Sequence, residues 1–198
     1  MKQHWYNYLW ICSVLYFALG FFNILFAWLG LISFFLPLIF AIGKGSKGFC
    51  NRYCDRGQLL RMLGNQKGFS RKKDMPDWMK GKAFRYGFLL FFLTMFVSML
   101  LRTWQVSTGA ATLRETVTLF WTFQVPWHFA SPAGATPWVA QFTFGLYSLM
   151  LTSAILGILT MLLYKPRSWC VYCPMGTMTQ LICRAKAGDS DAEKKPMP

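Results

Sequence analysis

The chain has 198 residues, of which 55% are hydrophobic and 18% aromatic, and it carries a formal net charge of +14 at pH 7. Only 14% of the residues are charged, and the apolar residues fall in runs long enough to span a bilayer, about 18 residues or more. These features exclude an ordinary soluble globular domain and predict an integral membrane protein with one domain. They do not indicate a nucleic-acid partner, because the basic residues lie in loops beside apolar runs, as on the cytoplasmic side of a membrane.

The first apolar run extends from Tyr8 to Ile42. As one helix it would be about 52 Å long, against a hydrocarbon core of about 30 Å. We therefore expect two short spans joined by a turn around Gly20–Asn23, since Gly and Asn are turn residues. One long, tilted helix is the alternative. The run is also too long for the core of a signal peptide, so we expect no cleavage.

The segment Gly43–Lys82 carries eleven Lys and Arg against three Asp. The positive-inside rule places such a loop in the cytoplasm. The first cysteine pair, Cys50 and Cys54, lies at the start of this loop and therefore close to the membrane surface. A short helix is expected to follow at Gln58–Leu63.

The next span is predicted at Ala83–Leu101, and the segment Thr103–Pro137 then lies on the far side of the membrane. The far segment contains only one basic residue, Arg114, beside Arg102 at the end of the span. An amphipathic interfacial helix is predicted there, from apolar and polar residues at helical spacing: Leu113, Val117, Phe120, Trp121 and Gln124. An aromatic belt is predicted from four tryptophans: Trp104, Trp121, Trp127 and Trp138.

The last span is predicted at Trp138–Leu163 and returns the chain to the cytoplasm. The second cysteine pair, Cys170 and Cys173, follows at once, and Thr177–Cys183 is predicted to be another short helix. Residues 1–183 are thus expected to form a single membrane domain. Residues 184–198 are charged and small, which predicts a disordered cytoplasmic tail.

The two cysteine pairs stand in matching sequences, Gly48–Gly57 and Ser168–Gly176. In both, an aromatic residue precedes the first cysteine, a tyrosine precedes the second, and a glycine stands three residues after the second. This is an internal repeat, with one copy at about residues 20–64 and the other at about 138–183. We therefore predict an all-α membrane protein: a bundle of four (alternatively three) transmembrane helices with a pseudo-two-fold internal repeat and short interfacial helices.

A pseudo-two-fold axis along the membrane normal would bring Cys50, Cys54, Cys170 and Cys173 together at the cytoplasmic interface. Four thiolates can hold an iron–sulfur cluster or a zinc ion. Pro174 directly follows a cysteine, as in bacterial ferredoxins, which favours iron–sulfur. So do Gly57 and Gly176, which would let backbone amides approach inorganic sulfides. Three basic residues would offset the charge of such a cluster: Arg52, Arg56 and Arg167.

On these residues the chain resembles the four-helix membrane module of the NapH/NosR-type iron–sulfur proteins, over about residues 5–183. The resemblance implies that both motifs face the cytoplasm and that the module passes electrons between the quinone pool and other redox subunits. It also implies a cluster on the four cysteines, 4Fe–4S in preference to 2Fe–2S, with quinone as a further candidate ligand. The implied location is the inner (cytoplasmic) membrane.

The sequence departs from that family in four respects. Asp55 stands where the first motif is expected to have proline, and the second cysteine pair is separated by two residues instead of three. The helices are short, and the two ferredoxin-type repeats that commonly follow are absent. The resemblance therefore implies that electrons reach this cluster from another subunit, such as a flavoprotein, a ferredoxin-like protein or a cytochrome.

Other residues that could carry chemistry have simpler explanations. Cys12 lies within an apolar span and is expected to be a packing residue, and Cys183 is a fifth candidate ligand that is better explained as structural. His4 and His128 fall on opposite sides of the membrane and are not expected to share a haem. Three phenylalanines are lipid-facing or core residues by default, although they could shape a quinone pocket: Phe88, Phe91 and Phe92.

The favoured function is therefore a membrane electron-transfer subunit with a cytoplasmic cluster and no nucleic-acid partner. The alternative is a thiol–disulfide oxidoreductase of the DsbB or vitamin K epoxide reductase kind, which also has four membrane helices and two cysteine pairs. Its cysteines work on the oxidising side of the membrane, whereas the basic loops here place both pairs on the reducing side. A structural or assembly subunit that only holds metal is a third possibility.

Overall fold

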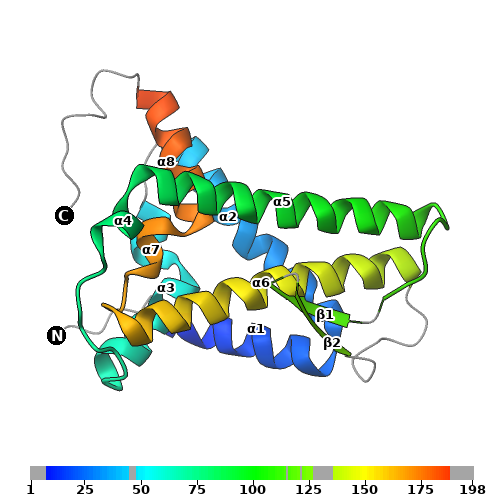
Figure 1. The fold of residues 1–198 in the computed structure, drawn as a ribbon, viewed down its shortest axis with the longest axis horizontal. Helices are drawn as coiled ribbons and strands as arrows, with labels where there is room; N and C mark the ends of the chain where they lie inside the picture. The colour runs from blue at the N-terminus through cyan, green and yellow to red at the C-terminus, as the bar shows by residue number, and fades with distance from the viewer. Residues whose placement is uncertain (1–7, 45–47, 115, 121, 127–135, 188–198) are drawn as a thin grey trace.

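The computed structural model describes residues 8–44, 48–114, 116–120, 122–126 and 136–187. The chain is mostly helical, and three of its helical segments are long and apolar enough to cross a membrane: Ile24–Gly43, Lys82–Ser107 and Pro137–Leu163. The long helices lie side by side, with short helices gathered at one end (Figure 1). The described residues are thus mostly helical apart from one small hairpin, which is consistent with the predicted all-α membrane protein.

The first apolar run is broken, as the sequence predicts. Helix α1 (Trp10–Phe22) ends at Asn23, which is extended and accepts a hydrogen bond from the Leu25 amide at 3.0 Å. A short 3-10 helix η2 (Ile24–Trp28) and helix α2 (Leu29–Lys44) follow. With 13 residues, α1 is about 20 Å long, shorter than the hydrocarbon core. The first run therefore supplies one candidate span and one shorter apolar helix.

Helices α5 (Lys82–Ser107) and α6 (Pro137–Leu163) form at the other two predicted spans, with α5 longer at its C-terminal end, and both are long and apolar enough to cross a membrane. Of the three candidate spans, α6 is the most buried. Its Gly145 lies directly against Met99 of α5, in keeping with the close approach that small residues permit between membrane helices. Its buried hydroxyl groups, such as Thr152, donate to carbonyls one turn earlier in the helix and so are satisfied.

The predicted interfacial helix around residues 113–124 is wrong, because the chain forms an antiparallel hairpin there. Strand β1 (Thr116–Leu119) pairs with β2 (Phe123–Pro126), and Phe120 at the turn has a positive φ of 50°. The β-branched sequence of β1 suits a strand better than a helix. Its alternation places Val117 in the core beside Phe144 of α6. Trp121 and Trp127 lie outside the described residues, whereas Trp104 and Trp138 are exposed at this end.

The opposite end consists of short elements: η3 (Phe49–Tyr53), α3 (Asp55–Arg61), η4 (Met62–Gln66), α4 (Asp77–Lys80), α7 (Trp169–Tyr172) and α8 (Pro174–Ala187). Both predicted short helices are present, as α3 with η4 and as α8. Because α8 continues to Ala187, the predicted tail cannot begin at residue 184; residues 188–198 lie outside the described part of the chain.

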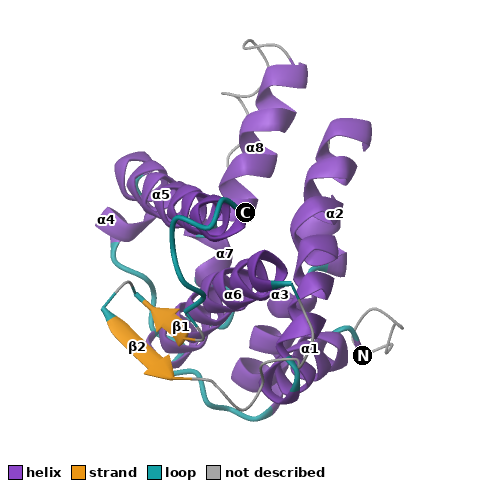
Figure 2. Ribbon diagram, turned by 90° about the vertical axis from the view of Figure 1, so that its right-hand side faces the viewer, coloured by secondary structure: helices purple, strands orange, loops and turns teal. Residues whose placement is uncertain are grey.

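Each motif lies between two helices, and the helix before one motif contacts the helix after the other motif. Helix α2 packs on α8, and helix α6 packs on α3. Figure 2 shows α2 and α8 side by side. The helix before each motif therefore supports the helix after the other motif, and this places the two cysteine segments next to each other.

Candidate functional site

All four cysteines of the motifs lie at the end of the bundle where α2 and α6 end and α5 begins (Figure 1). Cys50 lies in η3 and Cys170 in α7, whereas Cys54 and Cys173 lie at the junctions with α3 and α8. The second cysteine of each pair has extended backbone dihedrals, with ψ of 111° at Cys54 and 129° at Cys173. Each pair is thus held in a turn between two helical segments.

The same backbone bond closes both turns. The Cys54 amide donates to the Phe49 carbonyl at 3.0 Å, and the Cys173 amide donates to the Trp169 carbonyl at 2.9 Å. In both motifs the acceptor is the aromatic residue directly before the first cysteine. The matching aromatic residues therefore occupy matching places in the structure.

The difference in spacing between the pairs is absorbed within the turn. The first motif, with three intervening residues, forms a π-type turn that spans five positions, whereas the second forms an α-type turn that spans four. A π-type turn accommodates one extra residue in a helix, and such turns are frequent at functional sites. The extra residue therefore leaves the closing bond intact.

The residue after each second cysteine begins the next helix. Asp55 is the first residue of α3, and Pro174 is the first residue of α8. Proline suits the first helical position because its fixed φ is already helical, and an acidic residue suits it because of the helix dipole. The unexpected aspartate thus fills the structural place of the expected proline.

The cysteines of one motif contact the other motif. A Cβ atom added at Gly57 would lie 3.6 Å from the Cys54 sulfur and 4.0 Å from the Cys170 sulfur. Across the same interface, the Cys50 sulfur lies 3.7 Å from Thr179 Oγ1 in α8. The sulfurs of Cys54 and Cys170, which are far apart in the sequence, therefore lie near the same point beside the first turn of α3.

Burial and neighbouring charged groups both change the pKa values of these thiols. Burial raises the pKa of Cys54, and the charges of Asp55, Cys170 and Cys173 raise it further. Although part of the Cys170 residue is exposed, desolvation of its sulfur raises its pKa to about 12, with Cys173 contributing. Cys54, Cys170 and Cys173 are therefore thiols at neutral pH in the protein alone, and a bound metal centre would displace their protons.

Backbone amides face two of the sulfurs. Burial raises the pKa of Cys173, and hydrogen bonds from the amides of Gly176 and Met175 oppose this rise. The Gly57 amide acts in the same way on Cys54. The two glycines were predicted to let amides approach inorganic sulfides; in the structure, their amides face cysteine sulfurs.

Two charged residues next to the first motif point into the bundle, where they make contacts that no local sequence pattern reveals. Asp55 accepts hydrogen bonds from Ser13 of α1 at 3.2 Å and, more weakly, from Ser33 of α2 at 3.5 Å. Arg56 donates to Ser153 of α6 at 2.8 Å. The two side chains therefore fix α3 against three surrounding helices.

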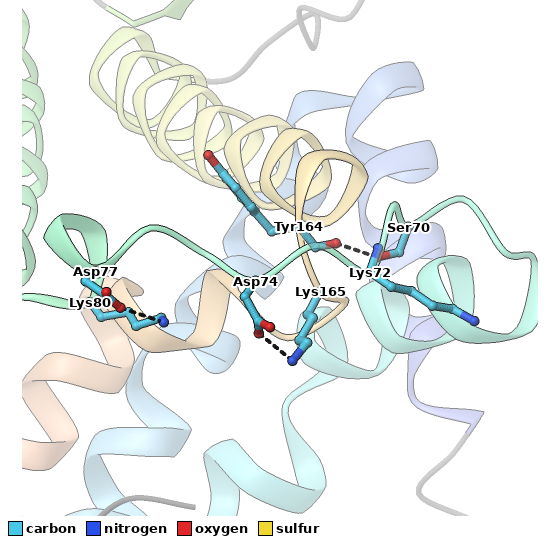
Figure 3. Close-up of polar contacts among 7 residues, drawn as sticks. All are labelled: Ser70, Lys72, Asp74, Asp77, Lys80, Tyr164 and Lys165. Atoms are coloured by element: carbon cyan, nitrogen blue, oxygen red, sulfur yellow. Dashed lines mark hydrogen bonds and ion pairs between the residues drawn. The ribbon is translucent and has the colours of Figure 1, made fainter.

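A polar strap crosses the end of α6 just before the second motif (Figure 3). Ser70 donates to the Tyr164 carbonyl, and Asp74 forms an ion pair with Lys165. The Lys165 contact lowers the pKa of Asp74. The basic loop that the sequence assigned to topology therefore also holds the exit of α6 in place.

The motifs bring four thiols to one end of the molecule, but these thiols are not arranged as a metal site. Among the described residues, no three His, Cys, Asp or Glu side chains are placed to hold a single metal ion. The set nevertheless offers four thiols, three amides that face sulfur, and the positive charge of Arg56, which lowers the pKa of Cys173. Soft thiolate donors select zinc or iron–sulfur centres.

The remaining candidates lie elsewhere. Cys12 is exposed on α1, so its predicted packing role is wrong: it faces outward from the bundle. Cys183 stands ten residues beyond Cys173, about 15 Å along α8 at 1.5 Å per residue.

Phe88 and Phe92 pack in the core, and neither of the two cavities described borders them or Phe91. His4 and His128 lie outside the described residues.

Comparison with known proteins gave no match: no family model, no curated protein and no solved structure is significantly similar to the chain.

Proposed function

We propose that the protein is a membrane electron-transfer subunit in which Cys50, Cys54, Cys170 and Cys173 hold one iron–sulfur cluster, 4Fe–4S in preference to 2Fe–2S. The observation that carries the proposal is the approach of Cys54 and Cys170, from different motifs, to the same point beside Gly57. Two cysteine pairs with separate roles would not be expected to have matching turns and to lie beside each other.

The residue after the second cysteine pair favours a cluster over zinc. Pro174 directly follows Cys173, as proline follows a ligand cysteine in bacterial ferredoxins. The cluster would supply one-electron redox chemistry at this end of the bundle.

The chain's own residues would tune such a centre. The amides of Gly57 and Gly176 already face cysteine sulfurs, and hydrogen bonds to sulfur raise the potential of an iron–sulfur centre. Arg56, fixed by Ser153, adds a positive charge beside Cys173. The crosswise contacts of α2 with α8 and of α6 with α3 support a pseudo-two-fold repeat that holds the two motifs together.

We further propose that the chain is a minimal relative of the NapH/NosR-type module in the cytoplasmic membrane, with the cysteine end facing the cytoplasm. The support is the charge distribution: eleven Lys and Arg lie in residues 43–82, against one in 103–137. The partners would be other redox subunits and a quinone. The basic cysteine end would suit an acidic partner such as a flavodoxin or ferredoxin.

Spectroscopy of protein purified without oxygen tests the cluster. We expect visible absorbance that decreases on reduction with dithionite, together with an EPR signal in one of the two oxidation states. Cys173→Ser should lose both, while Cys12→Ser, outside the site, should retain them. Wild-type protein without either signal would refute the proposal.

Thiol labelling separates this function from the disulfide alternative. A membrane-impermeant maleimide applied to intact cells should not label Cys50 or Cys170, because we expect both motifs to face the cytoplasm. Labelling from outside would favour a thiol–disulfide oxidoreductase instead.

A further inference from the structure

A second site lies at the end of the molecule opposite to the cysteines. A groove of about 840 Å³ opens between the C-terminal half of α5, the N-terminal half of α6, and the loop and hairpin that connect them. This volume is within the range of small-molecule sites, about 300–1,000 Å³. No part of the cysteine site borders it.

The two ends of this groove differ in chemistry. Its inner wall contains the buried side chains of Met95, Met99 and Leu149, about halfway along the candidate spans. Its outer rim carries Arg102 and Arg114, with the amide groups of three glutamines nearby: Gln105, Gln124 and Gln141. A single groove therefore passes from the apolar depth of a membrane to a basic, hydrogen-bonding rim.

The two arginines supply all the positive charge of a long stretch of the chain. They are the only Lys or Arg residues from position 102 to 163, and both line the groove. The described acidic residues are Asp55, Asp74 and Asp77, all in the segment at the cysteine end. Glu115, the one acidic residue from position 102 to 163, follows Arg114 and lies outside the described residues.

The outer wall is fixed to α6 and not loosely placed. The Arg114 amide donates to the Gln141 side chain at 3.0 Å, and the Thr118 amide donates to Ser148 Oγ at 3.0 Å. Val117 between them is fully buried against α6 and η2. The hairpin therefore holds the basic rim over the apolar wall.

We propose that this groove binds an anionic phospholipid, with its phosphate on Arg102 and Arg114 and an acyl chain along Met95 and Leu149. Guanidinium groups bind phosphate oxygens strongly because their donors match the geometry of the anion. The position also fits: the rim lies near the ends of the candidate spans, at the level of lipid headgroups, and the apolar wall lies at the level of the acyl chains. The inference does not depend on the iron–sulfur cluster.

Native mass spectrometry of the full-length protein in detergent tests the proposal. Dilauroyl phosphatidylglycerol, dilauroyl phosphatidylcholine and inorganic phosphate would be titrated separately. We expect retention of phosphatidylglycerol, at least about tenfold weaker binding of phosphatidylcholine, and no retention of inorganic phosphate. The double variant Arg102→Gln/Arg114→Gln should bind phosphatidylglycerol about tenfold or more weakly.

Two controls make the result specific. Lys67→Gln/Arg71→Gln removes the same charge from the exposed loop at the cysteine end and should bind phosphatidylglycerol like the wild type. Ala110→Trp keeps all charges but fills part of the groove, so it should weaken binding even if the double arginine variant does not fold. Equal binding by wild type, Arg102→Gln/Arg114→Gln and Ala110→Trp would overturn the proposal. So would equal binding of the two lipids, or retention of phosphate alone, which would indicate a site for free anions.

Discussion

The two cysteine motifs reach the same backbone arrangement with different residues. The first uses a π-type turn with Asp55 at the start of the next helix, and the second uses an α-type turn with Pro174. What they share is the closing bond to the preceding aromatic residue and the glycine amide that faces the second cysteine. The spacing of the two cysteines and the residue after the second cysteine can therefore differ between motifs as long as these two features remain.

The motifs also differ in how they are supported. The second is packed in an aromatic cluster, where Tyr172 contacts Phe84, Phe88 and Trp169. The first is tied to its neighbours through the polar contacts of Asp55 and Arg56. Substitutions at matching positions should therefore have different effects.

Replacing the tyrosine before the second cysteine should give the largest difference in stability between the two motifs. Tyr172 is 3% exposed, and its hydroxyl hydrogen bonds with Thr160 at 2.5 Å, whereas Tyr53 is only half-buried. Tyr172→Ala should destabilise the protein by about 3–5 kcal/mol, and Tyr53→Ala by roughly half of that. Denaturant unfolding in a fixed detergent, followed by circular dichroism, measures both. Equal losses would mean that the motifs are supported alike.

The residue after the second cysteine should show losses of similar size that arise from different interactions. Asp55→Ala removes the acceptor for Ser13 and Ser33 and should cost about 1–3 kcal/mol. Pro174 is fully buried, so Pro174→Ala removes buried ring atoms and increases the freedom of the unfolded chain, and should also cost about 1–3 kcal/mol. Asp55→Asn, which keeps an acceptor oxygen, should recover part of the loss. Recovery by Asp55→Pro instead would show that only the helix start matters.

The ion pair of the strap should have the smallest effect. Since the pKa of Asp74 is lowered in the folded state, the pair stabilises the protein above the unfolded pKa of about 4, and this stabilisation is lost as the pH falls through the folded pKa. Both partners are exposed, so the contribution is small. Asp74→Asn should therefore lower the melting temperature slightly at pH 7, and by less as the pH falls below the unfolded pKa of about 4. A difference that grows toward pH 3 would contradict this sign.

The sequence predicted what depends on long runs and on repeated motifs. The three long apolar segments, the break near Asn23 and the two short helices after the cysteines followed from hydropathy, turn residues and the repeat. It missed the hairpin because Leu113, Val117 and Phe120 match a helical period in a region where β-branched residues and tertiary contacts with α6 decide the structure.

Only part of the candidate site could be predicted from the sequence. The four cysteines stand out by spacing, and the glycines by their matching positions. The inward contacts of Asp55 and Arg56 depend on serines far away in the sequence, and no local pattern reveals them. The basic groove at the other end likewise needs the hairpin to bring Arg114 over α5 and α6. The sequence shows that Arg114 is the only Lys or Arg in residues 103–137, but it does not show where Arg114 lies in the fold.

Iron content in single cysteine variants tests most directly whether both motifs serve one centre. In protein purified without oxygen, the wild type should contain about four iron atoms and four sulfides per chain, as a 4Fe–4S cluster requires. Cys54→Ser and Cys173→Ser should each abolish nearly all of both. Variants that each retain half of the iron would show two separate sites, and a wild type without iron would contradict the electron-carrier function altogether.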